Sequence, residues 1–344
     1  MEYTNLGRTG LKVSRLCLGT MSFGPRATEE ESFAIMDKAW ECGIQFFDTA
    51  DVYGWKDHEG YTEQIVGRWM QERGLRDQIV LATKFQGPMG EGINDRGASA
   101  KYIRRAVEAS LKRLRTDHID LYQMHHVNRD TPWEEVWQAM EVLVQQGKIL
   151  YAGSSNHAGW HVVQANEAAR RRNFLGYVSE QCKFSLACRF AELELLPACL
   201  EYGVGVLPYS PLDGGYLGGM FEEVRETACA NPKATIRRQN ADVRSRAVAS
   251  RAQLEAYESL CAGLGERPSN LALAWVLRHP AVTAPLIGPR TIGQFTESLR
   301  SLEIKLSEET LRQLDEIFPP VALPHILASN KSPYRHEAPE AFAW

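Results

Sequence analysis

The chain has 344 residues, of which 44% are hydrophobic, so it can bury a large core. Its net charge of -4, with acids and bases interspersed, argues against nucleic acid or an anionic membrane as a partner. No apolar run could span a bilayer, and the first residues do not resemble a signal peptide. The seven cysteines form no CxxC pair, so we expect reduced thiols in a cytoplasmic protein, with Cys17 and Cys182 as packing residues.

A β-hairpin is expected first, over Tyr3–Ser14, with its turn at residues 7–10. Eight short apolar runs follow and are predicted to be strands: Leu16–Thr20, Gln45–Ala50, Ile79–Lys84, Ile119–His125, Ile149–Asn156, Tyr177–Phe184, Val204–Ser210 and Val282–Gly288. Such runs are typical of strands that are buried on both faces of a parallel sheet.

Amphipathic segments separate the predicted strands. One of them repeats apolar residues at helical spacing: Ile103, Val107, Leu111 and Leu114. The tryptophan-rich face after Pro132, a favoured residue at a helix start, is interpreted as core packing rather than a cofactor box. Further helices are expected over residues 30–42, 60–72, 159–173, 192–202, 246–263, 269–279 and 291–301.

Eight strands that alternate with helices predict an α/β fold, a (β/α)8 TIM barrel, in a single domain over residues 1–344. No GxGxxG motif follows the first strand, which disfavours a Rossmann fold. Two long loops, Phe85–Ala98 and Asp213–Arg244, follow carboxyl ends of strands, where a barrel keeps its active site, and are expected to be functional. Residues 319–344 are expected to form an irregular tail.

Four side chains that can move or stabilise protons lie at the carboxyl ends of three successive predicted strands, or just past them: Asp48, Tyr53, Lys84 and His125. On a parallel barrel these ends share one face, so the four should converge. The ordinary pKa of tyrosine is about 10, and a nearby ammonium would stabilise its phenolate. Such a set can protonate a carbonyl oxygen while a cofactor delivers hydride to the carbon. Taken one at a time, each of these residues could have only a structural role, and His126 could be the functional histidine instead of His125. The four together at one face favour a catalytic role.

Motifs along nearly the whole chain, about residues 3 to 318, resemble the aldo-keto reductases. The matching segments are Leu18-Gly19-Thr20-Met21, the stretch from Phe47 to Gly54, Ala82-Thr83-Lys84, the stretch from Asp120 to His125, residues 147–156, Tyr209-Ser210-Pro211-Leu212 and Ile287-Gly288-Pro289-Arg290. The resemblance implies one barrel domain and NADPH-dependent reduction of aldehydes or ketones. It also implies that Tyr53 is the general acid, that Lys84 lowers its pKa, that Asp48 pairs with Lys84, and that His125 orients the carbonyl.

The same resemblance assigns the cofactor contacts. Ser155, Asn156 and Gln181 would bind the nicotinamide carboxamide, whereas Tyr209 would stack on the ring. Gly19, Thr20 and Met21 would form a turn beside the cofactor, with Asp48 close by; Ser210, Leu212 and Gly214 would lie along the pyrophosphate. Gly288 belongs to the last motif, in which Arg290 would bind the 2′-phosphate of NADP(H), because guanidinium suits phosphate. Gln294 and Glu297 would reach the adenine and ribose. Two positions depart from the pattern: Phe184 replaces a tyrosine, and Ser298 replaces the asparagine of many relatives.

Specificity is less constrained by the sequence. Phe23, Trp55, Gln86 and His126 are candidates for the pocket of a small carbonyl substrate. No metal site is predicted. A second hypothesis is a regulatory, redox-sensing subunit like the β subunits of voltage-gated potassium channels, although no long N-terminal inactivating segment is evident. A third is a keto-deoxysugar nucleotide as substrate, with Arg237, Arg238 and Arg244 at its diphosphate; a solvated lid or a clamp over NADPH is the alternative for these arginines.

Overall fold

The computed structural model describes residues 1–54, 58–220 and 241–321. The strands are β1 (Tyr3–Asn5), β2 (Lys12–Ser14), β3 (Cys17–Gly19), β4 (Phe46–Asp48), β5 (Val80–Phe85), β6 (Ile119–Met124), β7 (Ile149–Ser155), β8 (Tyr177–Gln181), β9 (Gly205–Val206) and β10 (Leu286–Ile287). The α-helices are α1 (Glu29–Glu41), α2 (Tyr61–Arg73), α3 (Ala100–Leu114), α4 (Trp133–Gln145), α5 (Gly159–Arg170), α6 (Leu195–Glu201), α8 (Ala241–Ala249), α9 (Arg251–Gly263), α10 (Pro268–Leu277), α11 (Ile292–Leu299) and α12 (Glu308–Ile317). Short 3-10 helices are η1 (Arg76–Gln78), η2 (Phe190–Leu193), η3 (Asp213–Gly215) and η4 (Arg300–Leu302).

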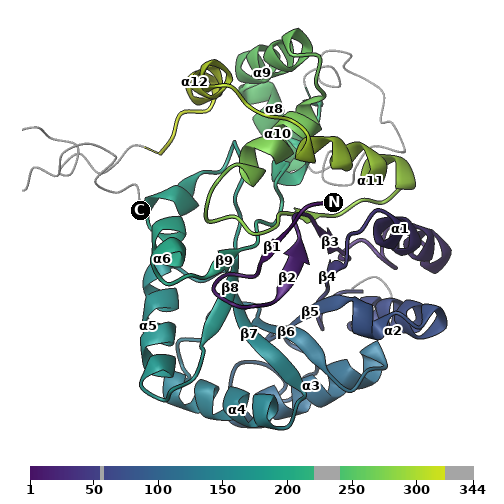
Figure 1. Ribbon diagram of the computed structural model, residues 1–344, viewed down its shortest axis with the longest axis vertical. Helices are drawn as coiled ribbons and strands as arrows, with labels where there is room; N and C mark the ends of the chain where they lie inside the picture. The colour runs from purple at the N-terminus through teal and green to yellow at the C-terminus, as the bar shows by residue number, and fades with distance from the viewer. Residues whose placement is uncertain (55–57, 221–240, 322–344) are drawn as a thin grey trace, which may run out of the picture.

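The strands from β3 to β10 form a closed parallel barrel. Their order in the eight-stranded sheet is β10-β3-β4-β5-β6-β7-β8-β9. The ring closes where Val206 in β9 pairs with Val282, and where the Thr283 N–H donates to the Val206 carbonyl at 2.9 Å. Helices surround the strands (Figure 1). The predicted (β/α)8 barrel and the N-terminal hairpin are therefore confirmed.

The last two barrel strands are shorter than predicted. Regular pairing covers two residues in β9 and two in β10, instead of Val204–Ser210 and Val282–Gly288. Each predicted segment contains a proline, Pro208 or Pro285, which has no N–H to donate to a neighbouring strand. Isolated hydrogen bonds, such as Leu286 N–H to the Pro208 carbonyl at 2.8 Å, continue the barrel wall past these prolines.

The helical predictions need two corrections. The helix expected over residues 246–263 is divided at Ser250, whose φ of -113° and ψ of 31° are not helical and whose hydroxyl donates to the Arg246 carbonyl at 2.6 Å. Helix α12 was not predicted, although Ser307 caps it by accepting from the Thr310 N–H at 3.1 Å and two glutamates fill its first turn. Residues 322–344 of the expected tail lie outside the described residues.

Core packing accounts for the aromatic face and the cysteines singled out in the sequence. Trp137 of α4 is fully buried in the layer between helices and barrel, and its indole N–H donates to the Ala165 carbonyl at 2.8 Å. Cys17 and Cys182 are buried free thiols, and burial raises the pKa of each well above its ordinary value. Both predictions of a packing role agree with this placement. Across the described residues, no helix is both long and apolar enough to cross a membrane.

The hairpin β1–β2 closes one end of the barrel and leaves the other end for the site. In Figure 1 it lies over the centre of the ring of strands. Leu6 and Val13 of the hairpin segment are buried with Phe46 and Leu121 from the strands. Its turn approaches the amino ends of β8 and β9, where the Arg8 N–H donates to the Gly203 carbonyl at 2.7 Å. The opposite, carboxyl end of the strands therefore carries the open mouth.

The turn of this hairpin contains two glycines that can test how tightly the hairpin packs against the end of the barrel. Gly7 has a φ of +53°, and a Cβ there would lie 2.5 Å from the Val178 carbonyl oxygen, whereas a Cβ on Gly10 would meet nothing within 4 Å. We predict that Gly7→Ala lowers the free energy of unfolding by at least about 2 kcal/mol. Gly10→Ala should change it by less than about 0.5 kcal/mol. Denaturant unfolding measures both free energies, and equal effects of the two substitutions would contradict close packing of this turn against the barrel.

Candidate active site

The barrel brings the four predicted catalytic side chains to one mouth. Asp48 ends β4, Lys84 lies in β5, and His125 follows β6. Tyr53 lies in the loop after β4, where its N–H donates to the Ala50 carbonyl at 3.2 Å and its carbonyl accepts from Gly60 at 3.0 Å. These bonds hold the Tyr53 backbone beside the end of β5.

Lys84 is the centre of the group. Its Nζ donates to Asp48 Oδ2 at 2.5 Å, to the Thr49 carbonyl at 2.8 Å and to the Tyr53 hydroxyl at 3.4 Å. The Lys84 and Asp48 side chains are 0% and 1% exposed. Burial acts to lower the pKa of Lys84, but the charges and hydrogen bonds of Asp48 and Tyr53 outweigh it and raise that pKa above its ordinary value. The ammonium therefore stays charged beside the phenol.

Asp48 is held by three side-chain donors. Besides Lys84 at Oδ2, the amide groups of Gln123 and Gln181 donate to Oδ1 at 2.9 and 2.8 Å. These three donors satisfy the hydrogen-bonding capacity of a side chain that is buried away from water. The Gln181 N–H that faces Asp48 is thus committed to the protein. The sequence did not predict this role for Gln181, nor any role for Gln123.

His125 is a neutral imidazole beside Tyr53. The two rings lie 6.0 Å apart between centroids and are nearly perpendicular, and the His126 ring stacks on the His125 ring at 5.0 Å. Burial and the nearby Lys84 charge lower the pKa of His125 to about 2. Between pH 5 and 9 the ring can therefore offer a hydrogen bond without carrying charge.

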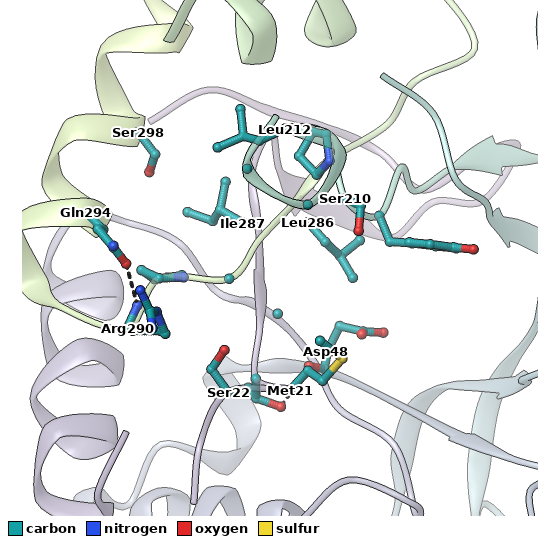
Figure 2. Close-up of a pocket in the computed structure, with 18 of the residues that line it drawn as sticks. Met21, Ser22, Asp48, Ser210, Leu212, Leu286, Ile287, Arg290, Gln294 and Ser298 are labelled. Atoms are coloured by element: carbon teal, nitrogen blue, oxygen red, sulfur yellow. Dashed lines mark hydrogen bonds between the residues drawn. The ribbon is translucent and has the colours of Figure 1, made fainter. Parts of the chain in front are cut away.

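A cavity of about 680 Å³ opens in front of the tetrad formed by Asp48, Tyr53, Lys84 and His125, and it runs to helices α10 and α11. Figure 2 shows its length, with Asp48 and Met21 at one end and Arg290, Gln294 and Ser298 near the other. All the residues predicted to bind cofactor line it: Gly19, Thr20, Met21, Asp48, Ser155, Asn156, Gln181, Tyr209, Ser210, Leu212, Gly214, Gly288, Arg290, Gln294 and Glu297. Tyr53 and His125 also reach the cavity, whereas Lys84 lies buried behind Tyr53.

The predicted substrate residues divide. His126 lines the cavity. Phe23 does not: the turn after β3 folds back, with the Phe23 N–H donating to the Thr20 carbonyl at 2.8 Å, and the ring is fully buried in the core. The expectation for Phe23 is therefore wrong. Gln86, in the loop after β5 at a φ of 109°, is also absent from the described lining. Trp55 lies outside the described residues, as do Arg237 and Arg238 and the side chain of Arg244.

Asn156 and Tyr209 form a fixed polar wall. Asn156 has a left-handed φ of 58°, and its amide N–H groups donate to the His125 carbonyl at 3.0 Å and to Ser155 Oγ at 3.1 Å. Its oxygen accepts from the Tyr209 hydroxyl at 2.8 Å. The Tyr209 ring is thereby anchored at the cavity wall by the same residue that braces the His125 backbone.

Asp213 anchors the turn that carries the expected pyrophosphate contacts. Its buried carboxylate pairs with Lys183 at 2.8 Å and with Arg246 of α8. Burial acts to raise the pKa of Asp213, but hydrogen bonds from the two cations lower it below its ordinary value. Ser210 and Asp213 both adopt positive φ, and Gly214 follows at 73°. Sequence reasoning did not single out Asp213, because its partners come from two distant segments.

Sequence reasoning also missed the wall formed by α10. Four residues at the start of α10 line the cavity: Arg267, Ser269, Asn270 and Leu273. Two residues from the turn after β3, Ser22 and Arg26, line it as well. No motif marks the start of α10 beyond Pro268 at its first turn.

A buried carboxyl group lies behind this site. Glu180, next to Gln181 in β8, accepts from Ser154 Oγ at 2.5 Å and from the His157 N–H at 3.0 Å. Burial raises the pKa of Glu180 to about 8 and lowers that of His157 to about 4. Both side chains are therefore neutral at pH 7. Among the described residues, no three His, Cys, Asp or Glu side chains are arranged to hold a metal ion.

Comparison with known proteins identifies the class that this barrel and tetrad define. Residues 15–318 match the Aldo/keto reductase family, and the chain belongs to it. Over the full length of both chains it is 50% identical to an uncharacterized oxidoreductase, YrpG, of Bacillus subtilis. It is 33% identical to the versiconal hemiacetal acetate reductase of Aspergillus parasiticus, over 94% of this chain and 98% of the relative. It is 32% identical to a probable voltage-gated potassium channel subunit beta of Oryza sativa, over 88% and 92%.

Family membership supports the coarser predictions. The resemblance to aldo-keto reductases is confirmed, and oxidoreductase relatives support carbonyl reduction with a nicotinamide cofactor.

Glu180 predicts a pH dependence of stability. Its folded pKa of about 8 exceeds its ordinary value of 4.5, so between these pH values the folded state holds a proton that the unfolded state has lost. Stability from this group is complete below pH 4.5 and falls as pH rises to 8, with a slope of up to about 1.4 kcal/mol per pH unit. Glu180→Gln should remove this slope, whereas His157 and His161 remain in both proteins. Urea unfolding at several pH values measures the difference, and parallel curves for the two proteins would contradict the assignment.

Proposed function

We propose that this chain is an NADPH-dependent aldo-keto reductase that reduces an aldehyde or ketone to an alcohol, with Tyr53 as the proton donor. One observation carries the proposal: the Lys84 ammonium reaches both Asp48 Oδ2 and the Tyr53 hydroxyl, at 2.5 and 3.4 Å, in the mouth of the barrel. The cavity in front of Tyr53 has the volume of a cofactor pocket.

The residues present fit a nicotinamide dinucleotide. Polar groups of Ser155 and Asn156 lie near the tetrad, as a nicotinamide carboxamide requires, and the aromatic ring of Tyr209 stands beside them. Backbone at Gly214 and Gly288 allows close approach of a pyrophosphate. When bound, the reduced cofactor supplies the hydride that no side chain can supply.

The side chains of the tetrad then have distinct roles. The Tyr53 hydroxyl donates its proton to the carbonyl oxygen, and Lys84 stabilises the phenolate that remains. Asp48 keeps Lys84 charged and aimed at Tyr53. His125, neutral at working pH, donates a hydrogen bond that orients the carbonyl. In this proposal the acid and the orienting donor act on the same carbonyl oxygen from one mouth of the barrel.

The phosphate end favours NADPH over NADH. Arg290 lines the cavity, and its backbone N–H donates to Gln294 Oε1 at 2.9 Å (Figure 2). Thr291 caps α11 immediately after it by accepting from the Gln294 N–H at 3.2 Å. A guanidinium next to a helix N-terminus suits a phosphate monoester.

The relative from Oryza sativa favours a second candidate, a channel-associated regulatory subunit that senses cofactor redox state. The two functions share the site and differ in turnover. A protein that binds NADPH but leaves it unoxidised with a broad panel of aldehydes and ketones would favour the regulatory function. Rapid oxidation with several members of the panel would favour the reductase. The hypothesis of a keto-deoxysugar nucleotide as substrate depends on Arg237, Arg238 and Arg244. Their side chains lie outside the described residues, so the structure offers no distances that support it.

Removal of the Tyr53 hydroxyl tests the proton donor. Tyr53→Phe should lower kcat by about 10²–10⁴-fold, the usual contribution of a general acid, and change NADPH affinity by less than about threefold. The control is Tyr202→Phe, which removes a phenol bonded to Glu167 at 3.1 Å outside the cavity. NADPH oxidation with a reactive aldehyde measures kcat, and fluorescence titration measures binding. Unchanged turnover in Tyr53→Phe would exclude Tyr53 as the acid.

Removal of the Arg290 guanidinium tests cofactor choice. Arg290→Ala should weaken NADPH binding by about 10–100-fold and leave NADH binding nearly unchanged, because only NADPH carries the 2′-phosphate. The control is Arg300→Ala, which removes an exposed arginine paired with Glu266 and Glu303. Equal losses for the two cofactors in Arg290→Ala would argue that Arg290 does not read the 2′-phosphate.

A further inference from the structure

Gln123 is a buried amide at the same level of the barrel as Lys84. The parallel pairing of β5 with β6 sets Lys84 opposite Gln123, so the two side chains leave neighbouring strands on the same face of the sheet. Both are fully buried. Lys84 Nζ lies 2.5 Å from Asp48 Oδ2, and Gln123 Nε2 lies 2.9 Å from Asp48 Oδ1. The ammonium and the amide therefore bind different oxygens of one carboxylate.

A glycine on the next strand leaves room for Gln123. Gly153 in β7 pairs with Gln123 in register, and a Cβ at this glycine would lie 3.0 Å from Gln123 Cγ and 2.5 Å from Ser179 Oγ. The φ of Gly153 is not positive, so its backbone conformation does not demand a glycine. The space that the missing side chain leaves is instead used by its neighbours, and it lets the stem of Gln123 extend towards Asp48.

The chemistry of the carboxylate fixes the orientation of both amides. A carboxylate accepts hydrogen bonds and cannot donate them, so Gln123 must present its N–H groups to Asp48. Its own oxygen then accepts from Gln181 Nε2 at 3.4 Å, and the same Nε2 donates to Asp48 Oδ1 at 2.8 Å. Oδ1 thus holds both amide donors, and rotation of the carboxylate would break both bonds. This arrangement keeps Oδ2 directed at the Lys84 ammonium.

The contact between Lys84 and Tyr53 depends on how the charge of Asp48 is shared. Of the three contacts of Lys84 Nζ, the one with the Tyr53 hydroxyl is the longest, at 3.4 Å. Without the Gln123 donor, Lys84 would have to compensate more of the carboxylate charge, and its attraction to Oδ2 would be stronger. The ammonium would then be drawn towards Asp48 and away from the phenol.

We propose that Gln123 is a positioning residue for the proton transfer: by donating to Asp48 Oδ1, it holds the carboxylate so that the Lys84 ammonium stays available to the Tyr53 hydroxyl. Among the described residues that line the cavity, Gln123 is absent, so it acts through Asp48 and Lys84. Its role in turnover rests on the proposed function. Its effect on the Tyr53 phenol does not, because every group involved belongs to the protein.

The first experiment titrates the Tyr53 phenol in the full chain without cofactor. Gln123→Met removes the amide and keeps an unbranched side chain of similar length. The ultraviolet absorbance of phenolate is followed against pH, and the same titrations with Tyr53→Phe added identify the step that belongs to Tyr53. We expect the midpoint of that step to rise by at least about 0.5 pH units in Gln123→Met, because the ammonium stabilises the phenolate less. An unchanged or lower midpoint would overturn the inference.

The second experiment follows NADPH oxidation with a reactive aldehyde as a function of pH. A phenol that ionises at higher pH stays protonated to higher pH, so the alkaline limb of kcat should move up with the titration midpoint in Gln123→Met. At pH 7, kcat should fall by about 3–10-fold because the phenol is a weaker acid. KM for NADPH should change by less than about twofold, since the substitution leaves the cavity lining intact.

Ser179→Ala is the matched control. It removes a buried hydroxyl of β8 that lies beside Gly153 and has no hydrogen-bond partner in the part of the chain that the structure describes. Its titration midpoint and pH profile should equal those of the wild type. A shift as large as that of Gln123→Met would overturn the inference, because it would assign the effect to looser packing of the barrel interior.

Thermal melting checks that each variant is folded, and Gln123→Leu replaces Gln123→Met if the latter is not. A wild type that oxidises no NADPH with a broad panel of carbonyl compounds would overturn the proposed function. The titration would still decide the role of Gln123 in that case, so the two failures are distinguishable.

Discussion

The buried ion pair between Lys84 and Asp48 is the constraint on which the site depends. Neither charge is exposed to water, and such a pair is stable only when its remaining hydrogen-bonding groups are satisfied. The barrel meets that condition by converging donors: β5 supplies Lys84, β6 supplies Gln123 and β8 supplies Gln181 to one carboxylate on β4. Because the pair links these strands at their carboxyl ends, the position of the ammonium follows from the strand register. The geometry of these four side chains is thus a property of the whole sheet.

The strand that carries Lys84 is also held from its outer face. Successive residues of a strand point to opposite faces, so Thr83 points towards the helices, where its hydroxyl donates to Glu63 Oε1 at 2.6 Å. Glu63 in turn accepts from Arg113 of α3 at 2.6 Å. Asp51 lies near this group, and burial followed by the Glu63 charge raises its pKa well above the ordinary value. One arginine faces two acids, so a neutral Asp51 avoids an uncompensated charge. Both faces of β5 are therefore fixed by buried charge.

The sequence predicted the features that depend on local patterns, such as the ends of strands. It missed the features that depend on how a turn folds back or on partners far away in the chain. Strand ends marked by Asp48, Lys84 and His125 were identifiable because short apolar runs end in polar residues, and the barrel then places those ends together. Phe23 was misplaced because a turn, not its spacing, buries the ring. Asp213 finds its cations on segments far away in the chain. The commitment of Gln181 to Asp48, and the cavity wall on α10, likewise require the tertiary structure.

The two ends of the cavity are formed by different elements: strand ends at one end and helices at the other. Their ion pairs therefore respond differently to salt. The tetrad end consists of strand termini fixed by a pair that water does not reach, so added salt screens it little. The far end lies between α10 and α11, which are joined by Arg267 and Glu297, whose side chains are 67% and 44% exposed. An exposed pair contributes little to stability and is weakened by salt. Salt therefore weakens this link between the two helices more than it weakens the pair that holds Lys84. The strands thus keep the Lys84 ammonium beside the Tyr53 hydroxyl independently of the exposed pair at the helical end.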